Sequence, residues 1–220
     1  SGIVLFQSLF VCDNRISQSV YSIVMNQQRL QTLSCRKGNV FMQQERYMRR
    51  AMELAELGRG WTKTNPVVVA VLVKGDRIIG EGYHKKFGGL HAEREALADC
   101  RSRGEDPAGA DLYVTLEPCC HYGKTPPCTQ AIIEAGISHV FVGAKDINPL
   151  VAGGGIRQLR EQGILVTEGV LQEECEYQNR VFFHYIQTKL PYVRMKYAMT
   201  LDGKIASASG KSQWITGEAA

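Results

Sequence analysis

Four side chains in this sequence have the types and spacing of a catalytic metal site. His91 and Glu93 lie two residues apart, and Cys119 and Cys128 follow with eight residues between them. One imidazole and two thiolates suit Zn²⁺, and a catalytic zinc site leaves its fourth tetrahedral position for water. Zinc lowers the pKa of that water toward neutrality, and a carboxylate beside it can take up a proton and pass it on. We therefore predict His91, Cys119 and Cys128 as zinc ligands and Glu93 as the proton carrier.

A structural zinc site is the alternative for the same residues. Cys120 or His121 would then supply a fourth ligand and close the coordination sphere. Cysteine is also frequent as an ordinary small buried residue. Glu93 favours catalysis, because a structural site needs no ionisable acid beside its ligand. The fourth ligand separates the two hypotheses, since water there indicates catalysis and a protein side chain indicates structure.

The elements that must position these residues follow from hydrophobic periodicity. Apolar residues three and four apart predict a helix over residues 43–57, and the β-branched run Val67–Val73 predicts a buried strand that turns back into a second strand at residues 77–82. Helices and strands alternate after this hairpin, which predicts a three-layer α/β/α sandwich around one mixed sheet. The expected helices are 91–100, 128–135, 155–162 and 171–185, and the expected strands are 112–116, 139–144, 164–166 and 192–199.

The composition indicates a soluble, cytoplasmic globular protein. Its 220 residues are 44% hydrophobic and 22% charged, and the longest aliphatic run is far short of the roughly 20 residues that cross a bilayer. Seven unevenly clustered cysteines without a signal peptide predict a reducing compartment. Residues 1–41 hold four basic residues and one acid, whereas residues 42–220 hold 22 basic and 21 acidic residues. Because residues 42–220 have no basic excess, we expect neither a nucleic-acid partner nor a membrane.

The segment between the two cysteines resembles a known enzyme family. His-x-Glu followed by Pro-Cys is typical of zinc nucleobase deaminases, but most of these separate their two cysteines by only two residues. The longer run at residues 117–128, Glu-Pro-Cys-x-His-x-Gly-x-Thr-Pro-Pro-Cys, is similar to the deaminase domain of the bifunctional riboflavin-biosynthesis deaminase-reductases. Further motifs of that family match residues 65–66, 82–84, 91–93, 146–149 and 152–153, so the resemblance begins near Met42 and runs to the last residue.

This resemblance implies a cytidine deaminase-like fold and a particular substrate. The substrate would be the diaminopyrimidinone ribosylamino 5′-phosphate that follows opening of the GTP ring. Water would attack the ring carbon that bears the 2-amino group, and ammonia would leave. A lysine suits the phosphate, and asparagines offer donors and acceptors to a pyrimidine or a ribose. Taken singly, each contact also has an ordinary interpretation as a turn, cap or solvated loop residue. The family's substrate contacts fall on Asn65, His84, His121, Lys124, Asp146 and Asn148.

Three positions depart from the family's pattern. Val69 stands where Gly is usual and could crowd the backbone next to Asn65. Leu90 replaces a common Pro, and Cys120 replaces a common Ser. Cys120 matters most, because a second thiol beside Cys119 could compete for metal or oxidise.

Residues 190–220 resemble the opening of the family's NADPH-dependent reductase domain. Ala198 and Trp214 correspond to cofactor contacts, and Ser212 corresponds to a substrate contact. This stretch is far shorter than a complete nucleotide-binding domain, so we expect it not to bind NADPH. A lone strand at residues 192–199 would have to pack on the body, pair with another copy or stay disordered.

The predicted organisation has three parts. Residues 1–41 are expected to be an N-terminal extension, with a transit peptide and a segment ahead of a true start at Met42 as the two interpretations. Residues 42–189 form the zinc deaminase domain, and residues 190–220 form the truncated start of a reductase domain.

The leading hypothesis is a zinc hydrolase of riboflavin biosynthesis that acts on a small pyrimidine nucleotide. Its alternatives are another nucleobase or nucleotide deaminase and an inactive module with structural zinc, and the sequence leaves homo-oligomerisation open.

Overall fold

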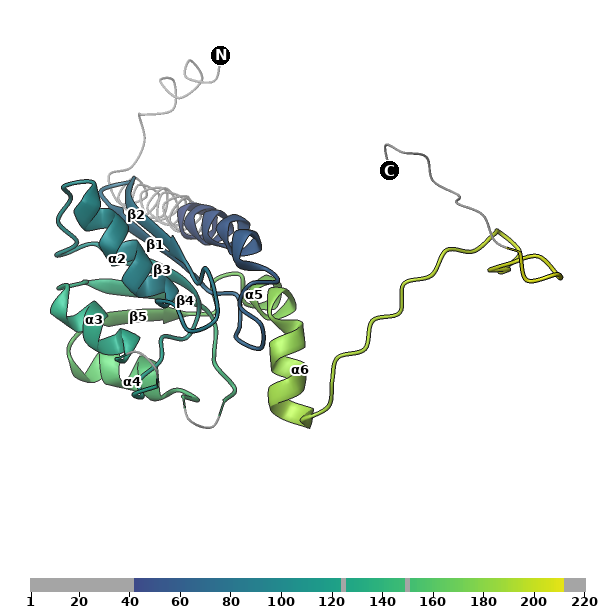
Figure 1. Ribbon diagram of the computed structural model, residues 1–220. Helices are drawn as coiled ribbons and strands as arrows, with labels where there is room; N and C mark the ends of the chain where they lie inside the picture. Colours follow the sequence, from purple (N-terminus) through teal and green to yellow (C-terminus); the bar gives the residue numbers. More distant parts are fainter. Residues whose placement is uncertain (1–41, 124–125, 149–150, 212–220) are drawn as a thin grey trace, which may run out of the picture.

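The computed structural model describes residues 42–123, 126–148 and 151–211, and its centre is one mixed β-sheet (Figure 1). The sheet has the strand order β2-β1-β3-β4-β5. β1 is antiparallel to both β2 and β3, whereas β3, β4 and β5 are parallel to one another. The predicted hairpin and mixed sheet are therefore confirmed. The strands are β1 (Val69–Lys74), β2 (Arg77–Tyr83), β3 (Asp111–Leu116), β4 (His139–Ala144) and β5 (Leu165–Glu168).

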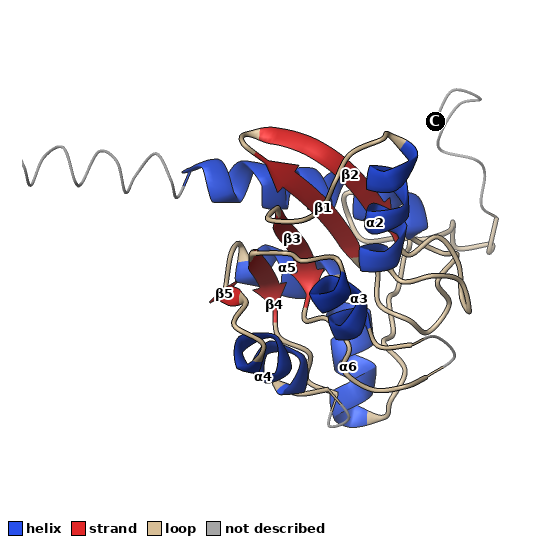
Figure 2. Cartoon of the chain, turned by 90° about the vertical axis from the view of Figure 1, so that its left-hand side faces the viewer, coloured by secondary structure: helices blue, strands red, loops and turns tan. Residues whose placement is uncertain are grey.

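Helices cover both faces of this sheet, which confirms the three-layer sandwich (Figure 2). One face carries α2 (Ala92–Ser102), α3 (Cys128–Glu134) and α4 (Gly154–Glu161). The other face carries the helix at residues 42–55, which continues into the short 3₁₀ turn η1 (Glu56–Gly58). On that face lie also α5 (Gln172–Gln178) and α6 (Arg180–Thr188).

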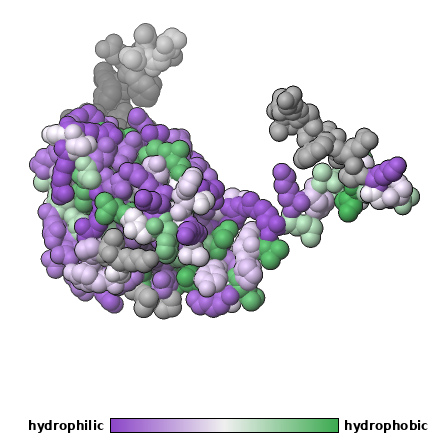
Figure 3. Space-filling view, in the orientation of Figure 1, coloured by the Kyte–Doolittle hydropathy of each residue, from purple (hydrophilic) through white to green (hydrophobic). Residues whose placement is uncertain are grey.

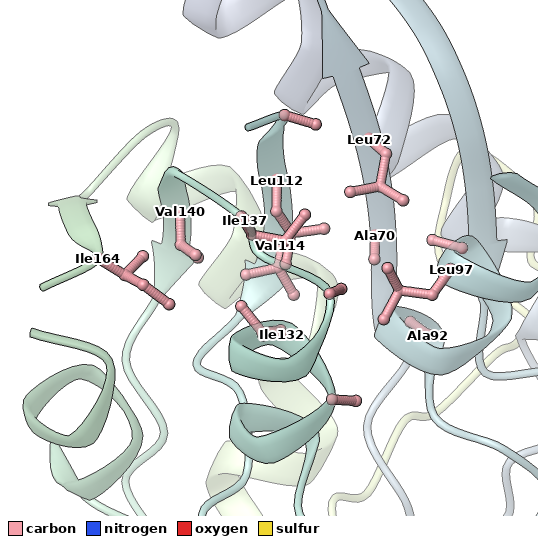
Figure 4. Packing of buried hydrophobic residues seen from close by; sticks show 14 of the residues in the cluster. Ala70, Leu72, Ala92, Leu97, Leu112, Val114, Ile132, Ile137, Val140 and Ile164 are labelled. Carbon is pink, nitrogen blue, oxygen red and sulfur yellow. The ribbon is translucent and has the colours of Figure 1, made fainter. Parts of the chain in front are cut away.

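Alternation along the strands divides the buried apolar side chains between two clusters. In β1, Ala70 and Leu72 belong to the cluster under α2, α3 and α4, whereas Val69, Val71 and Val73 belong to the cluster on the opposite face. Figure 4 shows the first cluster, in which side chains of β3 and β4 face those of the covering helices. Burial on both faces explains why the first strand is a continuous, valine-rich hydrophobic run.

Two glycines allow α2 to lie directly on β2. A Cβ at Gly82 would lie 2.2 Å from the Ala96 nitrogen and 2.5 Å from the Ala92 carbonyl oxygen, and one at Gly80 would lie 2.6 Å from the Ala96 carbonyl oxygen. Only a residue without a side chain permits this approach. Because His91 immediately precedes α2, these glycines determine where the first predicted ligand is placed.

The topology brings the chemistry-bearing segments to one edge of the sheet. The carboxyl ends of β2, β3 and β4 meet at this edge, and β1 begins there. Residues 117–121 follow β3, residues 145–148 follow β4, and His84 follows β2. Open α/β sheets bind ligands in the crevice outside the carboxyl ends of their parallel strands. The site is therefore expected at this edge.

The single helix predicted over residues 171–185 is wrong, because the chain forms α5 and α6 with a break at Asn179. Asn179 departs from helical geometry, with φ −102° and ψ 17°. Its side chain pairs with the backbone of Val67: the Val67 N–H donates to Oδ1 at 2.8 Å, and Nδ2 donates to the Val67 carbonyl oxygen at 2.9 Å. A contact between residues so distant in the sequence leaves no trace in local periodicity.

The strand predicted over residues 192–199 is also wrong. α6 ends at Thr188, Lys189 takes the left-handed conformation at φ 59°, and residues 190–211 then run away from the body (Figures 1 and 3). Val193 is 83% exposed and Met195 is 79% exposed. The described sheet includes no residue of this segment, and a strand without a partner leaves its backbone groups to water.

The predictions for residues 1–41 lie outside the described residues. Within the part of the chain that the structure describes, no helix is both long enough and apolar enough to span a membrane.

Candidate active site

The three predicted metal ligands come together from three different elements. His91 is the residue immediately before α2, Cys119 lies on the segment that follows β3, and Cys128 is the first residue of α3. His91 Nδ1 lies 3.5 Å from Cys119 Sγ and 3.3 Å from Cys128 Sγ. The three ligand atoms all lie within 4.8 Å of one another. Among the described residues, neither Cys120 nor His121 belongs to this group.

The donor set and its spacing fit Zn²⁺. Zinc–nitrogen bonds of about 2.0 Å and zinc–sulfur bonds of about 2.3 Å at tetrahedral angles place N and S atoms about 3.5 Å apart. The two observed N···S separations are close to that value. Three ligands leave one tetrahedral position of the ion for another group, which is the pattern of catalytic zinc sites.

Hydrogen bonds and the start of α3 favour the thiolate form of Cys119, which is the form that binds zinc. The Cys128 N–H donates to Cys119 Sγ at 3.4 Å, and the Thr129 N–H donates to the Cys119 carbonyl oxygen at 3.2 Å. The pKa of Cys119 is lowered, chiefly by a hydrogen bond with the Cys128 thiol and next by one with His91. The first residues of helices also carry partial positive charge, which stabilises an adjacent thiolate.

Glu93 lies in the first turn of α2 and is 3% exposed. Burial raises the pKa of its carboxyl group above the ordinary glutamate value. A group that both accepts and releases a proton near neutral pH works best when its pKa is displaced toward that pH. The environment of Glu93 is therefore suited to proton transfer beside the three ligands.

A pocket of about 320 Å³ opens at this edge of the sheet. Its wall contains the polar side chains singled out from the sequence, together with several apolar ones. Cys128 is fully buried behind the wall. The lining includes Asn65, His84, His91, Glu93, Cys119, His121, Asp146 and Asn148.

A hydrogen-bond chain fixes the orientation of Asn65. His84 Nδ1 lies 2.9 Å from the Leu90 carbonyl oxygen, so Nδ1 carries a proton and donates it. Burial lowers the pKa of His84, which keeps the ring neutral and leaves Nε2 as an acceptor. Asn65 Nδ2 lies 3.2 Å from this Nε2 and donates to it. Asn65 Oδ1, an acceptor, is therefore the amide atom left for a ligand.

Two further predicted residues, His121 and Asp146, contribute polar groups to the pocket wall. His121 Nδ1 is buried without a hydrogen-bond partner among the described residues. Burial raises the pKa of Asp146, whose Oδ1 accepts a hydrogen bond of 2.8 Å from the Asn148 N–H. Buried polar atoms normally have partners, so an unpartnered imidazole nitrogen in a pocket is available to a bound ligand.

Some lining residues were not predicted as site residues. Phe182 reaches the pocket from α6, Phe87 comes from the loop after β2, and Glu117 follows β3. No local pattern marks the two aromatic residues, because an amphipathic helix or a loop carries such residues at many positions. Glu117 is visible in the sequence only as a member of the motif at residues 117–128.

The remaining predicted positions are Lys124, Ala198, Ser212 and Trp214. Lys124, Ser212 and Trp214 fall outside the described residues. Ala198 is exposed in the extended segment after α6 and does not line the pocket. Of the two predicted cofactor contacts, only Ala198 is among the described residues, and the structure does not bring it to this site.

The structure shows the surroundings of the three residues that depart from the family's pattern. Val69 packs in the cluster on the far face of the sheet, whereas its neighbour Val68 lines the pocket, so the expected crowding beside Asn65 does not arise from its side chain. Leu90 contributes the carbonyl oxygen that holds His84. Cys120 is half-buried and packs near Gly154, where an added Cβ would lie 2.9 Å from Cys120 Sγ.

Comparison with known families gives two matches in the order expected for a deaminase followed by a reductase. The cytidine and deoxycytidylate deaminase zinc-binding region matches residues 42–144, and the RibD C-terminal domain matches residues 191–220.

Individual relatives point the same way. The riboflavin biosynthesis protein RibD of Actinobacillus pleuropneumoniae is 62% identical over 174 residues, which cover 79% of this chain and 46% of that protein. RibD of Bacillus amyloliquefaciens is 51% identical over 177 residues, covering 80% of this chain and 47% of that protein. The crystal structure of a diaminohydroxyphosphoribosylaminopyrimidine deaminase/5-amino-6-(5-phosphoribosylamino)uracil reductase from Thermotoga maritima superposes with a TM-score of 0.77 at 52% identity, covering 80% of this chain and 50% of that one. The chain thus spans about half the length of the relatives it matches.

Proposed function

This chain belongs to the family of RibD riboflavin-biosynthesis proteins, and from that premise we propose that it is a zinc-dependent hydrolytic deaminase of a pyrimidine nucleotide. One observation carries the proposal: a buried acid, Glu93, lies beside a cluster of three zinc-compatible ligands on the wall of a pocket large enough for a small molecule. A structural zinc site would need neither the acid nor the pocket.

Each step of the deamination has a residue to perform it. The chemistry that zinc supplies when it is bound by His91, Cys119 and Cys128 is a water of near-neutral pKa. Glu93 accepts a proton from the attacking water and delivers it to the departing amino group. A C–O bond forms and the C–N bond breaks, so that ammonia leaves, and the second proton of the water ends on the ring nitrogen of the product. The raised pKa of Glu93 favours the protonated form that delivers this proton.

The pocket wall supports a polar heterocycle with a sugar attached. Asn65 offers an oriented acceptor to a ring N–H or amino group, because His84 holds its amide nitrogen. His121, Asp146 and Asn148 offer further polar groups in the same wall. We assign the substrate as the diaminopyrimidinone ribosylamino 5′-phosphate, with Lys124 as the partner of its phosphate. Support for this assignment comes from the deaminase name carried by the Thermotoga maritima relative.

Under this proposal, the segment after α6 is part of the region that carries a second activity, the reductase activity. Residues 191–220 match the RibD C-terminal domain, and the corresponding role is reduction of the deaminated product with NADPH. Ala198 and Trp214 are assigned to the cofactor and Ser212 to the substrate of that step. The described residues 190–211 are almost all exposed, and none of them lines the pocket beside His91 and Cys119.

An ammonia-release assay with two substrates tests the deaminase proposal. The purified chain, loaded with zinc, is incubated with the diaminopyrimidinone nucleotide or with dCMP, and ammonia is measured together with the zinc content. We expect release from the first substrate at a rate that scales with bound zinc, and little release from dCMP. No release from fully zinc-loaded protein would overturn the proposal, and faster release from dCMP would overturn the substrate assignment.

A further inference from the structure

Glu117 is a buried carboxylate that, among the described residues, accepts all its hydrogen bonds from one neighbouring segment. It lies immediately after β3 and is 4% exposed. Its Oε2 accepts hydrogen bonds from the backbone N–H groups of Asp146, at 3.3 Å, and Gly153, at 3.0 Å. Its Oε1 accepts from the N–H groups of Gly155, at 3.0 Å, and Ile156, at 3.2 Å.

These four bonds account for the burial of Glu117 and leave it no chemical role of its own. A carboxylate removed from water is costly unless it is hydrogen-bonded, and backbone donors at a helix start supply both hydrogen bonds and favourable charge. Two of the four donors, Gly155 and Ile156, lie in the first turn of α4. A carboxylate has about four acceptor positions. All of them are used here, so none remains for substrate or for a transferred proton.

The segment that Glu117 holds carries one polar wall of the pocket. Asp146 and Asn148 both line the pocket, and the Asn148 N–H donates to Asp146 Oδ1 at 2.8 Å. At its other end, the segment packs against the backbone next to Cys119. A Cβ at Gly155 would lie 2.0 Å from the Pro118 carbonyl oxygen. Glu117 therefore joins the strand end that bears a zinc ligand to the loop that bears Asp146 and Asn148.

We propose that Glu117 is a positioning residue for the deamination, which fixes the distance between the metal cluster and the wall formed by Asp146 and Asn148. This inference rests on the proposed deaminase function. Glu117 neither binds the metal nor moves a proton. It holds the groups that bind the part of the substrate away from the reacting carbon. Loosening this anchor weakens substrate binding more than it slows the chemical step, because Glu93 and the ligands keep their places.

The test compares three variants with the unchanged chain. Glu117→Gln keeps the shape but turns an NH₂ group toward two backbone N–H donors, and Glu117→Asp keeps the charge but withdraws it by one carbon. Glu161→Gln, at an exposed position on α4, is the control.

For Glu117→Gln we expect KM to rise roughly tenfold or more, the change that loss of such hydrogen bonds produces. We expect kcat to stay within about threefold and zinc to remain at one ion per chain. Glu117→Asp should lie between Glu117→Gln and the control, and it serves as the test variant if Glu117→Gln does not fold.

Hydrogen exchange supplies a readout that does not depend on activity. The amides of Asp146, Gly153, Gly155 and Ile156 should exchange faster in Glu117→Gln and should be unchanged in Glu161→Gln. Unchanged exchange and unchanged KM would overturn the proposal, as would a loss of zinc and kcat at constant KM. If the zinc-loaded unchanged chain releases no ammonia, the deaminase function itself fails. Calorimetry with the same nucleotide then decides the role of Glu117: weaker binding by Glu117→Gln supports positioning, and equal binding overturns it.

Discussion

At the scale of single residues, hydrogen-bond direction determines what the pocket can recognise. The Leu90 carbonyl oxygen sets the tautomer of His84, and the neutral His84 ring in turn sets the amide of Asn65. A residue type alone gives no such direction, because an asparagine amide can face either way until its partners are known. Residue type is likewise not enough to describe Glu93. The pKa of its carboxyl group is raised by burial, which its place in the motif does not reveal.

Replacing Glu93 by glutamine tests its role as the proton carrier. The amide keeps the shape of the side chain but cannot accept a proton, so kcat should fall about 10²–10⁴-fold while zinc stays bound. Turnover and zinc content are measured on the same preparation. Glu134→Gln, at an exposed position on α3, is the control and should behave like the unchanged chain. Full turnover by a zinc-loaded Glu93→Gln variant would remove Glu93 from the mechanism.

Serine substitutions at two neighbouring thiols distinguish an open zinc site from a closed one. Cys128→Ser removes one of three ligands and should lose most of the bound zinc, which elemental analysis measures after dialysis against a weak chelator. Cys120→Ser should keep one zinc per chain, because Cys120 lies outside the ligand group. Since a ligand that binds only the folded state raises its stability, Cys128→Ser should also melt at a lower temperature. Loss of zinc from Cys120→Ser would instead favour the structural site.

At the scale of elements, side chains that bridge distant segments determine where helices end and how they meet the sheet. Asn179 ends α5, and its side chain pairs with the backbone of Val67, two residues before β1, as a neighbouring strand would. Gly80 and Gly82 remove the side chains that would keep α2 away from β2. Both contacts help to place residues that line the pocket: Val67 lies two residues after Asn65, and α2 carries Glu93.

Truncating Asn179 should destabilise the protein more than an ordinary polar substitution does. Asn179→Ala leaves the Val67 N–H and C=O buried without partners, which costs about 2–4 kcal/mol of unfolding free energy. For a chain of this size the melting temperature should fall by roughly 5–15 °C. Asn179→Asp has the same shape and keeps the bond from the Val67 N–H, but sets an acceptor against the Val67 carbonyl oxygen. It should therefore also be destabilised. A melting temperature unchanged in both variants would show that the pairing with Val67 contributes little.

At the scale of the whole molecule, residues 42–189 and the segment after α6 differ in how they are packed. The body buries two apolar clusters on either side of its sheet. The segment of residues 190–211 adds nothing to either cluster and keeps Val193 and Met195 in water. Apolar side chains that stay exposed along an extended segment contribute no hydrophobic stabilisation.

The 220-residue chain should therefore not bind NADPH with measurable affinity. A dinucleotide needs a concave site that encloses most of its surface, and residues 190–211 are exposed along their length. Titration of the chain with NADPH, followed by nucleotide fluorescence or by calorimetry, should show no saturation in the micromolar range. Saturable micromolar binding would show that residues 190–220 form a cofactor site with the body.

Local patterns in the sequence were sufficient for most of the elements and for the grouping of His91, Cys119 and Cys128. The hairpin, β3, α3 and β4 were predicted within a few residues, because their hydrophobic periods arise from which neighbouring side chains face the core. These three residues were recognisable as a candidate metal site because zinc coordination limits both the residue types and their setting. The mixed-sheet sandwich followed from the order of the elements along the chain.

Tertiary structure alone decided the features that depend on partners far along the chain. The break at Asn179 requires Val67, and the anchoring of Glu117 requires four N–H groups of a segment that begins 29 residues later. The predicted strand at residues 192–199 has the right period but no partner in the sheet, so it stays extended and unpaired. Periodicity reports which face of an element is apolar. It does not report what that face meets, because the meeting depends on backbone hydrogen bonds and packing between segments that are remote in sequence.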